Sequence, residues 1–358
     1  MKTQLSLRDL MDQLKAENLL SPDVNENLAS ILTQEHVVPW AVNILMGLGI
    51  WLATLLFLGF MLLALTLKDP MLVVVGGSVL VATAILLNKL SKESLVLDQF
   101  ALAFSLTGQI LLSIGLSEMP IHKAWVALFI FVLAVILFII YQHQVHRFLT
   151  VLIAVSAALF LLQSLNLEQG LPLLIFAIAG GAVWCWLEEA SCLVRLPTLQ
   201  RPLGYGLAVA LLGLVSPSLP FLREFFYTNW TFVTLGLTGL LLFVIYHNLR
   251  LYRVAITTPS SLIIFASTLL VSGLLYQAPG VIAAVIVILL GFQRNNRFLM
   301  GLAFIFFLLF YISYYYYLDV TLLMKSITLM SAGVILLGLR FGLKPIYFDT
   351  SINTVNNP

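Results

Sequence analysis

Charged residues are scarce in this sequence. Only 9% of its 358 residues are Asp, Glu, Lys or Arg, whereas 61% are hydrophobic. Soluble domains typically contain about 25% charged and about 45–50% apolar residues, so this chain has too few charges to cover a water-soluble surface. The formal net charge is only +2, and the basic residues are scattered singly over short segments. The sequence therefore predicts no basic patch and no nucleic-acid partner.

The sequence also lacks the short motifs that mark many active sites. It contains no phosphate-binding glycine loop, no His-Glu-x-x-His and no Gly-x-Ser-x-Gly. Cys185 and Cys192, the two cysteines, are seven residues apart, which is about 10 Å along a helix and too far for a disulfide. His143 and His146 are predicted to share a short loop without a carboxylate or cysteine beside them, which is a weak metal pattern. We therefore predict that the protein is not an enzyme and holds no cofactor or metal.

Long apolar stretches fill most of the remaining chain. A membrane-spanning helix needs about 20 mainly apolar residues, and continuous apolar runs predict helices, because barrel strands alternate in polarity. Twelve spans are predicted, at residues 40–67, 71–87, 95–116, 124–141, 148–165, 171–187, 203–219, 230–246, 262–276, 281–292, 298–317 and 320–339. The predicted fold is an all-α polytopic integral membrane protein, whose first partner is the lipid bilayer.

The positions of Lys and Arg predict the orientation of these spans. With the amino terminus in the cytoplasm, 14 basic residues fall on inner segments and 3 on outer ones, while Lys325 lies inside the last span. Such an excess on short cytoplasmic loops is the positive-inside pattern. Deleting the weakest span, 203–219, would move every later basic pair outside. The sequence therefore predicts twelve spans with both termini cytoplasmic.

Four regions are predicted along the chain. Residues 1–36 have apolar residues at helical spacing, with Ser6 and Ser21 as helix N-caps, and are predicted to form a cytoplasmic hairpin of two amphipathic helices. The membrane part is divided into a first half of six helices and a second half of six, and a cytoplasmic tail follows. The boundaries are 1–36, 37–187, 188–340 and 341–358.

The two halves share a short sequence pattern. His146-Arg147-Phe148-Leu149 opens the fifth span, and Asn296-Arg297-Phe298-Leu299 opens the eleventh, 150 residues later. This offset predicts a parallel 6+6 internal repeat, an organisation found in some transporters. The alternative interpretation is chance likeness between two leucine-rich segments.

A few polar residues within the spans are candidates for contact with a ligand or a partner. Ionisable groups inside a membrane are costly and often functional, although those close to a helix end can extend to the interface instead. Gln109 lies at the centre of its span, on one helix face with Ser105 and Ser113. The predicted contact residues are Asp98, Gln109, Tyr314, Tyr315, Tyr316, Tyr317, Asp319, Lys325 and Ser326.

The C-terminal part of the sequence resembles a known family. The match consists of Tyr314-Tyr315-Tyr316-Tyr317-Leu318-Asp319, the segment 321–326, Gly333, and Leu336-Leu337 before Arg340. These residues are similar to the signature of a bacterial membrane-protein family of unknown function, often encoded beside small proteins with a GDYXXLXY motif. The resemblance implies a bacterial inner-membrane protein with such a partner, and it implies no activity.

Two functions are compatible with these features. The first is a non-catalytic subunit or scaffold of an envelope complex, which agrees with the missing catalytic motifs and the implied partner. The second is a transporter or lipid-handling permease with a site between the two halves, which agrees with twelve spans in two parallel sets. A sealed core with an exposed polar groove would favour the first, and a continuous polar cavity between the halves would favour the second.

Overall fold

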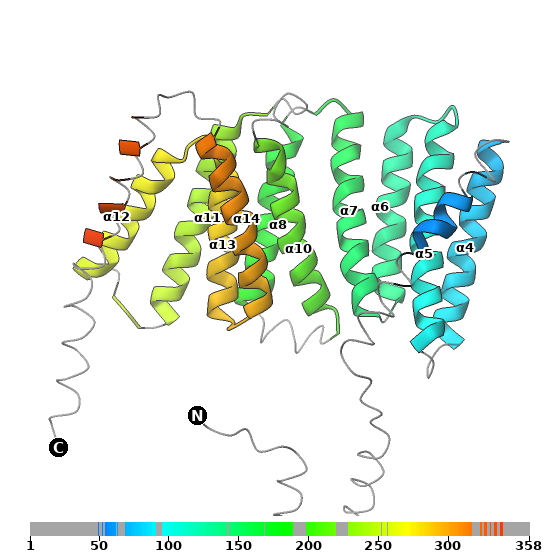
Figure 1. Cartoon of the computed structure of the whole chain (residues 1–358), viewed down its shortest axis with the longest axis horizontal. Helices are drawn as coiled ribbons and strands as arrows, with labels where there is room; N and C mark the ends of the chain where they lie inside the picture. The colour runs from blue at the N-terminus through cyan, green and yellow to red at the C-terminus, as the bar shows by residue number, and fades with distance from the viewer. Residues whose placement is uncertain are drawn as a thin grey trace, which may run out of the picture. The chain divides into compact units, whose positions relative to one another are not determined.

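The computed structural model describes residues 69–90, 95–141, 143–167, 169–188, 198–219, 228–251, 253–255 and 257–316, and separate positions between 49 and 63 and between 323 and 338. All regular structure in these residues is helical (Figure 1). The hairpin predicted at 1–36 and the tail at 341–358 lie outside the described residues. The chain divides into two compact units, Met1–Phe60 and Met61–Pro358. In the first unit the described residues 54–60 are helical.

The second unit contains ten described α-helices and one short 3₁₀ helix. They are α4 (Pro70–Leu90), α5 (Leu95–Glu118), α6 (Lys123–Ile140), α7 (Gln144–Ser164), α8 (Gly170–Leu187), α10 (Gln200–Val215), η1 (Ser216–Ser218), α11 (Trp230–Leu251), α12 (Pro259–Leu274), α13 (Pro279–Gln293) and α14 (Arg297–Tyr316). Each of the ten α-helices coincides with one of the predicted apolar stretches. The described positions between 323 and 338 are helical as well.

Seven of the described helices are long and apolar enough to cross a membrane. These are α4, α5, α6, α7, α8, α11 and α14. Helices α12 and α13 are also apolar but contain only 16 and 15 residues. The described part of the chain is therefore all-helical, and the chain is a polytopic, membrane-embedded protein, as its composition predicts.

Three helices end in the same type of turn. Asn166, Arg253 and Asn295 have positive φ angles of 53°, 56° and 50°. In each case the residue with positive φ and its successor donate backbone hydrogen bonds back into the last helical turn; the Leu167 N–H, for example, donates to the Leu162 carbonyl at 3.1 Å. This is the Schellman pattern, which satisfies the free carbonyl groups at a helix end. It turns the chain sharply, so that consecutive helices run antiparallel through short connections.

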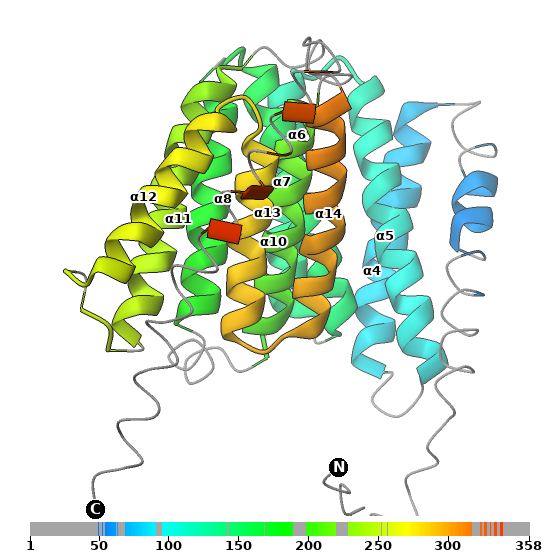
Figure 2. The same ribbon diagram turned by 60° about the vertical axis from the view of Figure 1, so that its left-hand side comes forward.

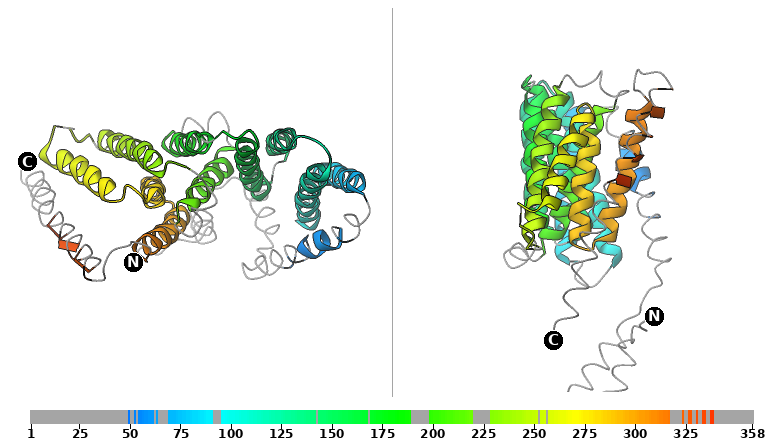
Figure 3. Two further views of the ribbon diagram at one scale, coloured as in Figure 1. Left: turned by 90° about the horizontal axis from the view of Figure 1, so that it is seen from above. Right: turned by 90° about the vertical axis from the view of Figure 1, so that its left-hand side faces the viewer.

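The helices of the second unit pack first with their chain neighbours. Helix α4 lies along α5, α6 along α7, and α13 along α14, as the side and end views show (Figures 2 and 3). At the first of these contacts, a Cβ atom added to Gly108 would lie 2.8 Å from the Gly77 carbonyl oxygen and 3.0 Å from the Val81 nitrogen. The α4 and α5 backbones therefore approach closely because neither glycine has a side chain, as is common between membrane helices.

Most of the buried apolar residues form one core. It is built from α7, α8, α10, α11, α13 and α14, and Ile175, Leu211, Val233 and Val287 are fully buried in it. A smaller cluster connects α4, α5, α6 and α7. Helix α7 contributes to both clusters, so it joins the two sets of helices.

Candidate functional site

Four buried polar side chains meet where α5, α6 and α7 pack together. Ser105 and Gln109 lie four residues apart on α5, which places them on the same helix face. Tyr141 directly follows α6, and His146 lies in the first turn of α7. None of the four side chains is more than 1% exposed. We call these four residues the polar cluster.

Hydrogen bonds connect three members of the polar cluster. The Gln109 side-chain amide donates to the Ser105 hydroxyl oxygen at 3.3 Å and to the Ser105 carbonyl at 3.2 Å. The Ser105 hydroxyl lies 2.8 Å from His146 Nε2. A hydroxyl has one proton and two lone pairs, so this contact fits either neutral tautomer of His146.

The imidazole is also held by an aromatic stack. The rings of His146 and Tyr141 lie nearly parallel, with an interplanar angle of 13° and centroids 3.8 Å apart. The stack buries both rings within the helix bundle.

Three buried atoms of the polar cluster have no hydrogen-bond partner. They are Gln109 Oε1, the Tyr141 hydroxyl oxygen and His146 Nδ1. A buried polar atom without a partner costs about 1–3 kcal/mol, so native structures rarely retain one without water, an ion or a functional role. The amide oxygen can accept a hydrogen bond, the phenol can donate one, and Nδ1 can do either, according to the tautomer. A small polar group with both donors and acceptors would therefore satisfy these buried atoms.

Sequence reasoning identified only half of the polar cluster. Gln109 was predicted to lie on one face with Ser105, and the structure agrees. His146 was predicted to lie in a loop, but it lies on α7 and is fully buried. Its partner Ser105 is 41 residues away, so no local spacing could have indicated the contact. The only local signal was the position of His146 at the start of an apolar stretch.

The next residue, Arg147, has a structural role. Its side chain is only 5% exposed, and its guanidinium donates to the carbonyl oxygens of Phe138 at 3.1 Å and Thr198 at 3.0 Å. Phe138 lies in the last turn of α6, where free carbonyl groups attract positive charge. Arg294 acts similarly on α8, because it donates to the carbonyl oxygens of Trp186 and Leu187.

A second candidate surface lies where α14 ends beside the connection between α12 and α13. The Tyr314 hydroxyl donates to the Leu274 carbonyl at 3.3 Å, and the Gln277 amide donates to the Tyr276 hydroxyl at 2.7 Å. Tyr276 is 48% exposed and Tyr316 is 75% exposed. We call this surface the tyrosine edge; it consists of Tyr276, Gln277, Tyr314, Tyr315 and Tyr316.

The other predicted contact residues lie elsewhere or outside the described residues. Asp98 lies in the first turn of α5 and is half-buried. It precedes Gln109 by eleven residues, or about 16 Å of helix, so the two do not form one site. Ser326 is helical and exposed, whereas Tyr317, Asp319 and Lys325 lie outside the described residues. No group of three or more metal-ligating side chains occurs among the residues that the structure describes.

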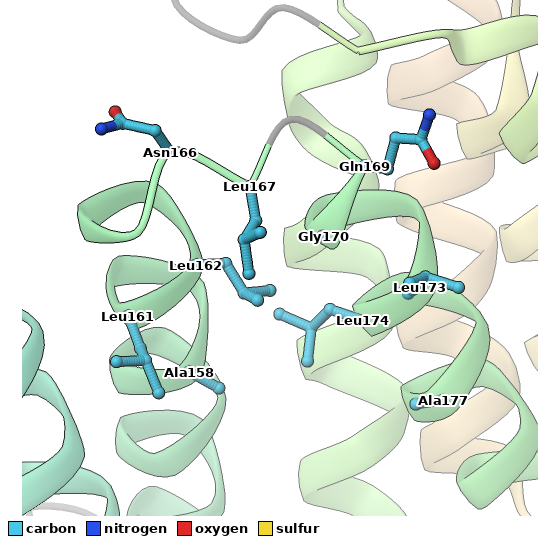
Figure 4. A pocket seen from close by; sticks show the side chains of 10 residues that line it. All are labelled: Ala158, Leu161, Leu162, Asn166, Leu167, Gln169, Gly170, Leu173, Leu174 and Ala177. Atoms are coloured by element: carbon cyan, nitrogen blue, oxygen red, sulfur yellow. The ribbon is translucent and has the colours of Figure 1, made fainter.

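A groove lies between the end of α7 and the start of α8 (Figure 4). Its volume is about 680 Å³, and it is lined by Ala158, Leu161, Leu162, Asn166, Leu167, Gln169, Gly170, Leu173, Leu174 and Ala177. Only Asn166 and Gln169 carry polar side chains, and both lie at the connection between the helices (Figure 4). We call this feature the α7–α8 groove.

Comparison with known proteins identifies a family but no activity. The family described as "Domain of unknown function (DUF4401)" matches residues 39–345. The chain belongs to this family. No curated protein and no solved structure matches the chain. The DUF4401 match includes every helix from α4 to α14, so the polar cluster, the tyrosine edge and the α7–α8 groove all lie within the family's domain.

Proposed function

We propose that this DUF4401 protein is a non-catalytic membrane subunit or scaffold of an envelope complex in the bacterial inner membrane. The observation that supports this function best is the packed apolar contact of α10 with α7 and α8. The Trp186 indole N–H donates to the Gly204 carbonyl at 3.1 Å, and a Cβ atom on Gly206 would lie 2.7 Å from Val151 Cβ. Helices α7 and α8 belong to the first predicted half, and α10 belongs to the second. Close packing at these contacts supports a scaffold over a permease with a pathway between the halves.

The proposal includes twelve spans with both termini in the cytoplasm. The cytoplasmic hairpin is 1–36, the membrane halves are 37–187 and 188–340, and the tail is 341–358. The parallel 6+6 repeat is also proposed, with α7 and α14 as equivalent helices. Each of these helices has an Arg-Phe-Leu segment in its first two turns and packs along the preceding helix. Their side chains differ, since Arg147 is buried and Arg297 is exposed.

The tyrosine edge is the proposed partner-binding surface. Tyrosine side chains supply large amphipathic contacts and are enriched at the energetic centres of protein interfaces. The Tyr314 hydroxyl is held by the Leu274 carbonyl, while Tyr316, two residues further along α14, is 75% exposed. Lys325 lies six residues after Asp319 in the proposed last span, where its cation would add a contact for phenol rings or acidic groups. The proposed partner is a membrane protein with a GDYXXLXY domain.

Co-purification with a co-expressed GDYXXLXY-domain protein tests this proposal. Replacing an aromatic residue at the centre of an interface typically costs about 2 kcal/mol or more. We therefore expect Tyr316→Ala combined with Lys325→Met to reduce partner recovery at least tenfold, while the variant still inserts into the membrane. Tyr246→Ala, at the carboxyl end of α11, is the matched control because Tyr246 is also exposed. Equal partner recovery with the double variant and the wild type would refute the assignment and leave the tyrosines as an interfacial belt.

A second candidate function is a transporter or lipid-handling permease. The observation that favours it is the fully buried His146 with an unpartnered ring nitrogen. Ionisable residues within membrane helices often belong to ion or proton pathways. The polar cluster is formed by α5, α6 and α7, however, and all three belong to the proposed first half. A pathway through it would therefore not run between the two halves.

A further inference from the structure

We propose that Arg201, Arg297 and the Tyr205 hydroxyl bind the phosphate of an anionic phospholipid where the first turns of α10 and α14 meet. This lipid site goes beyond the proposed scaffold function and does not depend on it. It is inferred from the hydrogen-bond donors that the two helices bring together and from the level of the membrane at which they lie. We call Arg201, Tyr205, Asn296 and Arg297 the donor cluster.

One hydrogen bond and one ring contact join the two helices at the donor cluster. The Asn296 side-chain amide donates to the Tyr205 hydroxyl, although the two residues are 91 positions apart in the sequence. The Tyr205 ring packs edge-on against Phe298, with centroids 5.9 Å apart and an interplanar angle of 73°. Arg297 lies between Asn296 and Phe298 in the sequence. Arg201 precedes Tyr205 by four residues, which places both on one face of α10. The two arginines therefore lie on adjoining helices beside the same tyrosine.

The hydrogen bonds of the donor cluster leave several donors unused. Asn296 Oδ1 accepts from the Leu299 backbone N–H at 3.1 Å, so the amide nitrogen is the atom that faces Tyr205. The phenol oxygen accepts this bond, and its own proton remains to be donated. The guanidiniums of Arg201 and Arg297 are exposed and donate to no described residue. The complementary ligand therefore has several acceptor oxygens and a negative charge, as a phosphate has.

The charge around the donor cluster also favours an anion. Arg294, in the connection between α13 and α14, donates to the carbonyl oxygens of Trp186 and Leu187. The Trp186 ring packs edge-on against Tyr205, with centroids 5.2 Å apart, so a third positive charge lies close to the cluster. Among the described residues at these ends of α8, α10, α13 and α14, Glu188 is the one acid. Three arginines against one glutamate leave an excess of positive charge, which favours a lipid with net negative charge.

The position of the donor cluster in the membrane identifies the anion as a lipid headgroup. Helix α14 is long and apolar enough to cross a membrane, and Arg297 is its first residue, so the cluster lies at the level of the headgroups. The next residue, Phe298, is 70% exposed, so an apolar surface adjoins the cations. A soluble anion or an acidic peptide would leave that surface unused, whereas a phospholipid has a phosphate beside its acyl chains. Basic pockets between membrane helices bind anionic headgroups in this way.

The test measures the binding of phosphatidylglycerol to the full-length protein in mild detergent by native mass spectrometry. Arg201→Gln combined with Arg297→Gln should weaken the binding of the first lipid molecule at least tenfold, because it removes both charged donors. Arg250→Gln combined with Arg253→Gln is the matched control, because it removes two exposed arginines at the carboxyl end of α11. The control variant should weaken this binding by less than about threefold, because these arginines lie outside the donor cluster.

Tyr205→Phe is a second test that changes no charge. It removes the phenol proton but keeps the ring between Trp186 and Phe298. Binding of phosphatidylglycerol should weaken about threefold or more, because one donor to the phosphate is lost. The double arginine variant should keep the wild-type unfolding midpoint without lipid, since both arginines are exposed and bond to no described residue.

Four results would overturn the proposal. Equal weakening by the two double variants would mean that the basic residues attract anionic lipid without a defined site. Wild-type binding in Tyr205→Phe would mean that the phenol does not contact the phosphate. Equal binding of phosphatidylcholine and phosphatidylglycerol by the wild type would show that the site does not select net negative charge. Complete displacement of phosphatidylglycerol by inorganic phosphate would identify a soluble anion as the occupant.

Discussion

His146 is held by contacts that come entirely from other elements. Ser105 on α5 supplies the hydrogen bond, and Tyr141 at the end of α6 supplies the ring stack. The imidazole therefore joins three helices, and its second nitrogen remains available within the bundle. A residue in such a position has a structural role through Nε2 and can have a chemical role through Nδ1.

The structural role predicts the effect of removing Ser105. Ser105→Ala leaves His146 Nε2 and one Gln109 amide proton buried without the serine hydroxyl, which should destabilise the fold by about 1–3 kcal/mol. Ser117→Ala is the control, because Ser117 is exposed and its hydroxyl only bonds back to the Ser113 carbonyl on its own helix. Thermal unfolding in mild detergent should show a lower midpoint for Ser105→Ala alone. Equal midpoints would mean that water replaces the hydroxyl and that the network is not a structural element.

At this scale the sequence was informative only where the contact is local. The shared face of Ser105 and Gln109 could be predicted because helical spacing places residues i and i+4 together. The contact of Ser105 with His146 depends on how three separate helices pack. Tyr314 was predicted as a contact residue, but the carbonyl that it contacts, at Leu274, is 40 residues away.

At the scale of helices, the positions were predictable and the packing faces were not. Continuous apolar stretches define where a membrane helix runs, which is why α4 to α14 coincide with the predicted spans. The same stretches are apolar on every side, so no polar face shows which side meets another helix. Gly77 and Gly236 lie against neighbouring helices, whereas Gly180 and Gly239 face open space. The sequence does not distinguish these two kinds of glycine, because all four lie within apolar stretches.

This difference between glycines predicts opposite effects of alanine substitution on stability. Gly108→Ala should destabilise the protein by about 1–3 kcal/mol, because the new methyl group meets the α4 backbone and overpacks the contact. Gly239→Ala should be neutral or stabilising by up to about 1 kcal/mol, because alanine favours the helix and the methyl group meets nothing. Denaturation of both variants in the same detergent measures the difference. If Gly108→Ala is as stable as Gly239→Ala, α4 and α5 do not approach each other closely in the membrane.

At the scale of the whole membrane part, basic residues lie at or contact the carboxyl ends of several helices. Lys89 and Arg250 lie in the last turns of α4 and α11, while Arg147 and Arg294 donate to carbonyls at the ends of α6 and α8. Consecutive helices run antiparallel, so these four carboxyl ends lie at one face of the second unit, the lower face in Figure 1. The negative end of the helix dipole favours a cation by about 0.3–1 kcal/mol. The basic residues that predict orientation therefore also stabilise the helix ends.

This arrangement leads to the prediction about topology. If the face with these basic residues is cytoplasmic, Arg253 and Asn295, which follow α11 and α13, lie inside, and Gln277 between α12 and α13 lies outside; all three are exposed. Single cysteines are placed at these positions in a background with Cys185→Ala and Cys192→Ala. In intact cells an impermeant maleimide should label Gln277→Cys, and it should label Arg253→Cys and Asn295→Cys only after the membrane is opened. The reverse pattern would invert every connection of the second unit and place the tyrosine edge on the cytoplasmic side. Labelling of all three in intact cells would instead show that α12 and α13, with only 16 and 15 residues, do not both cross the bilayer, and the count of twelve spans would be wrong.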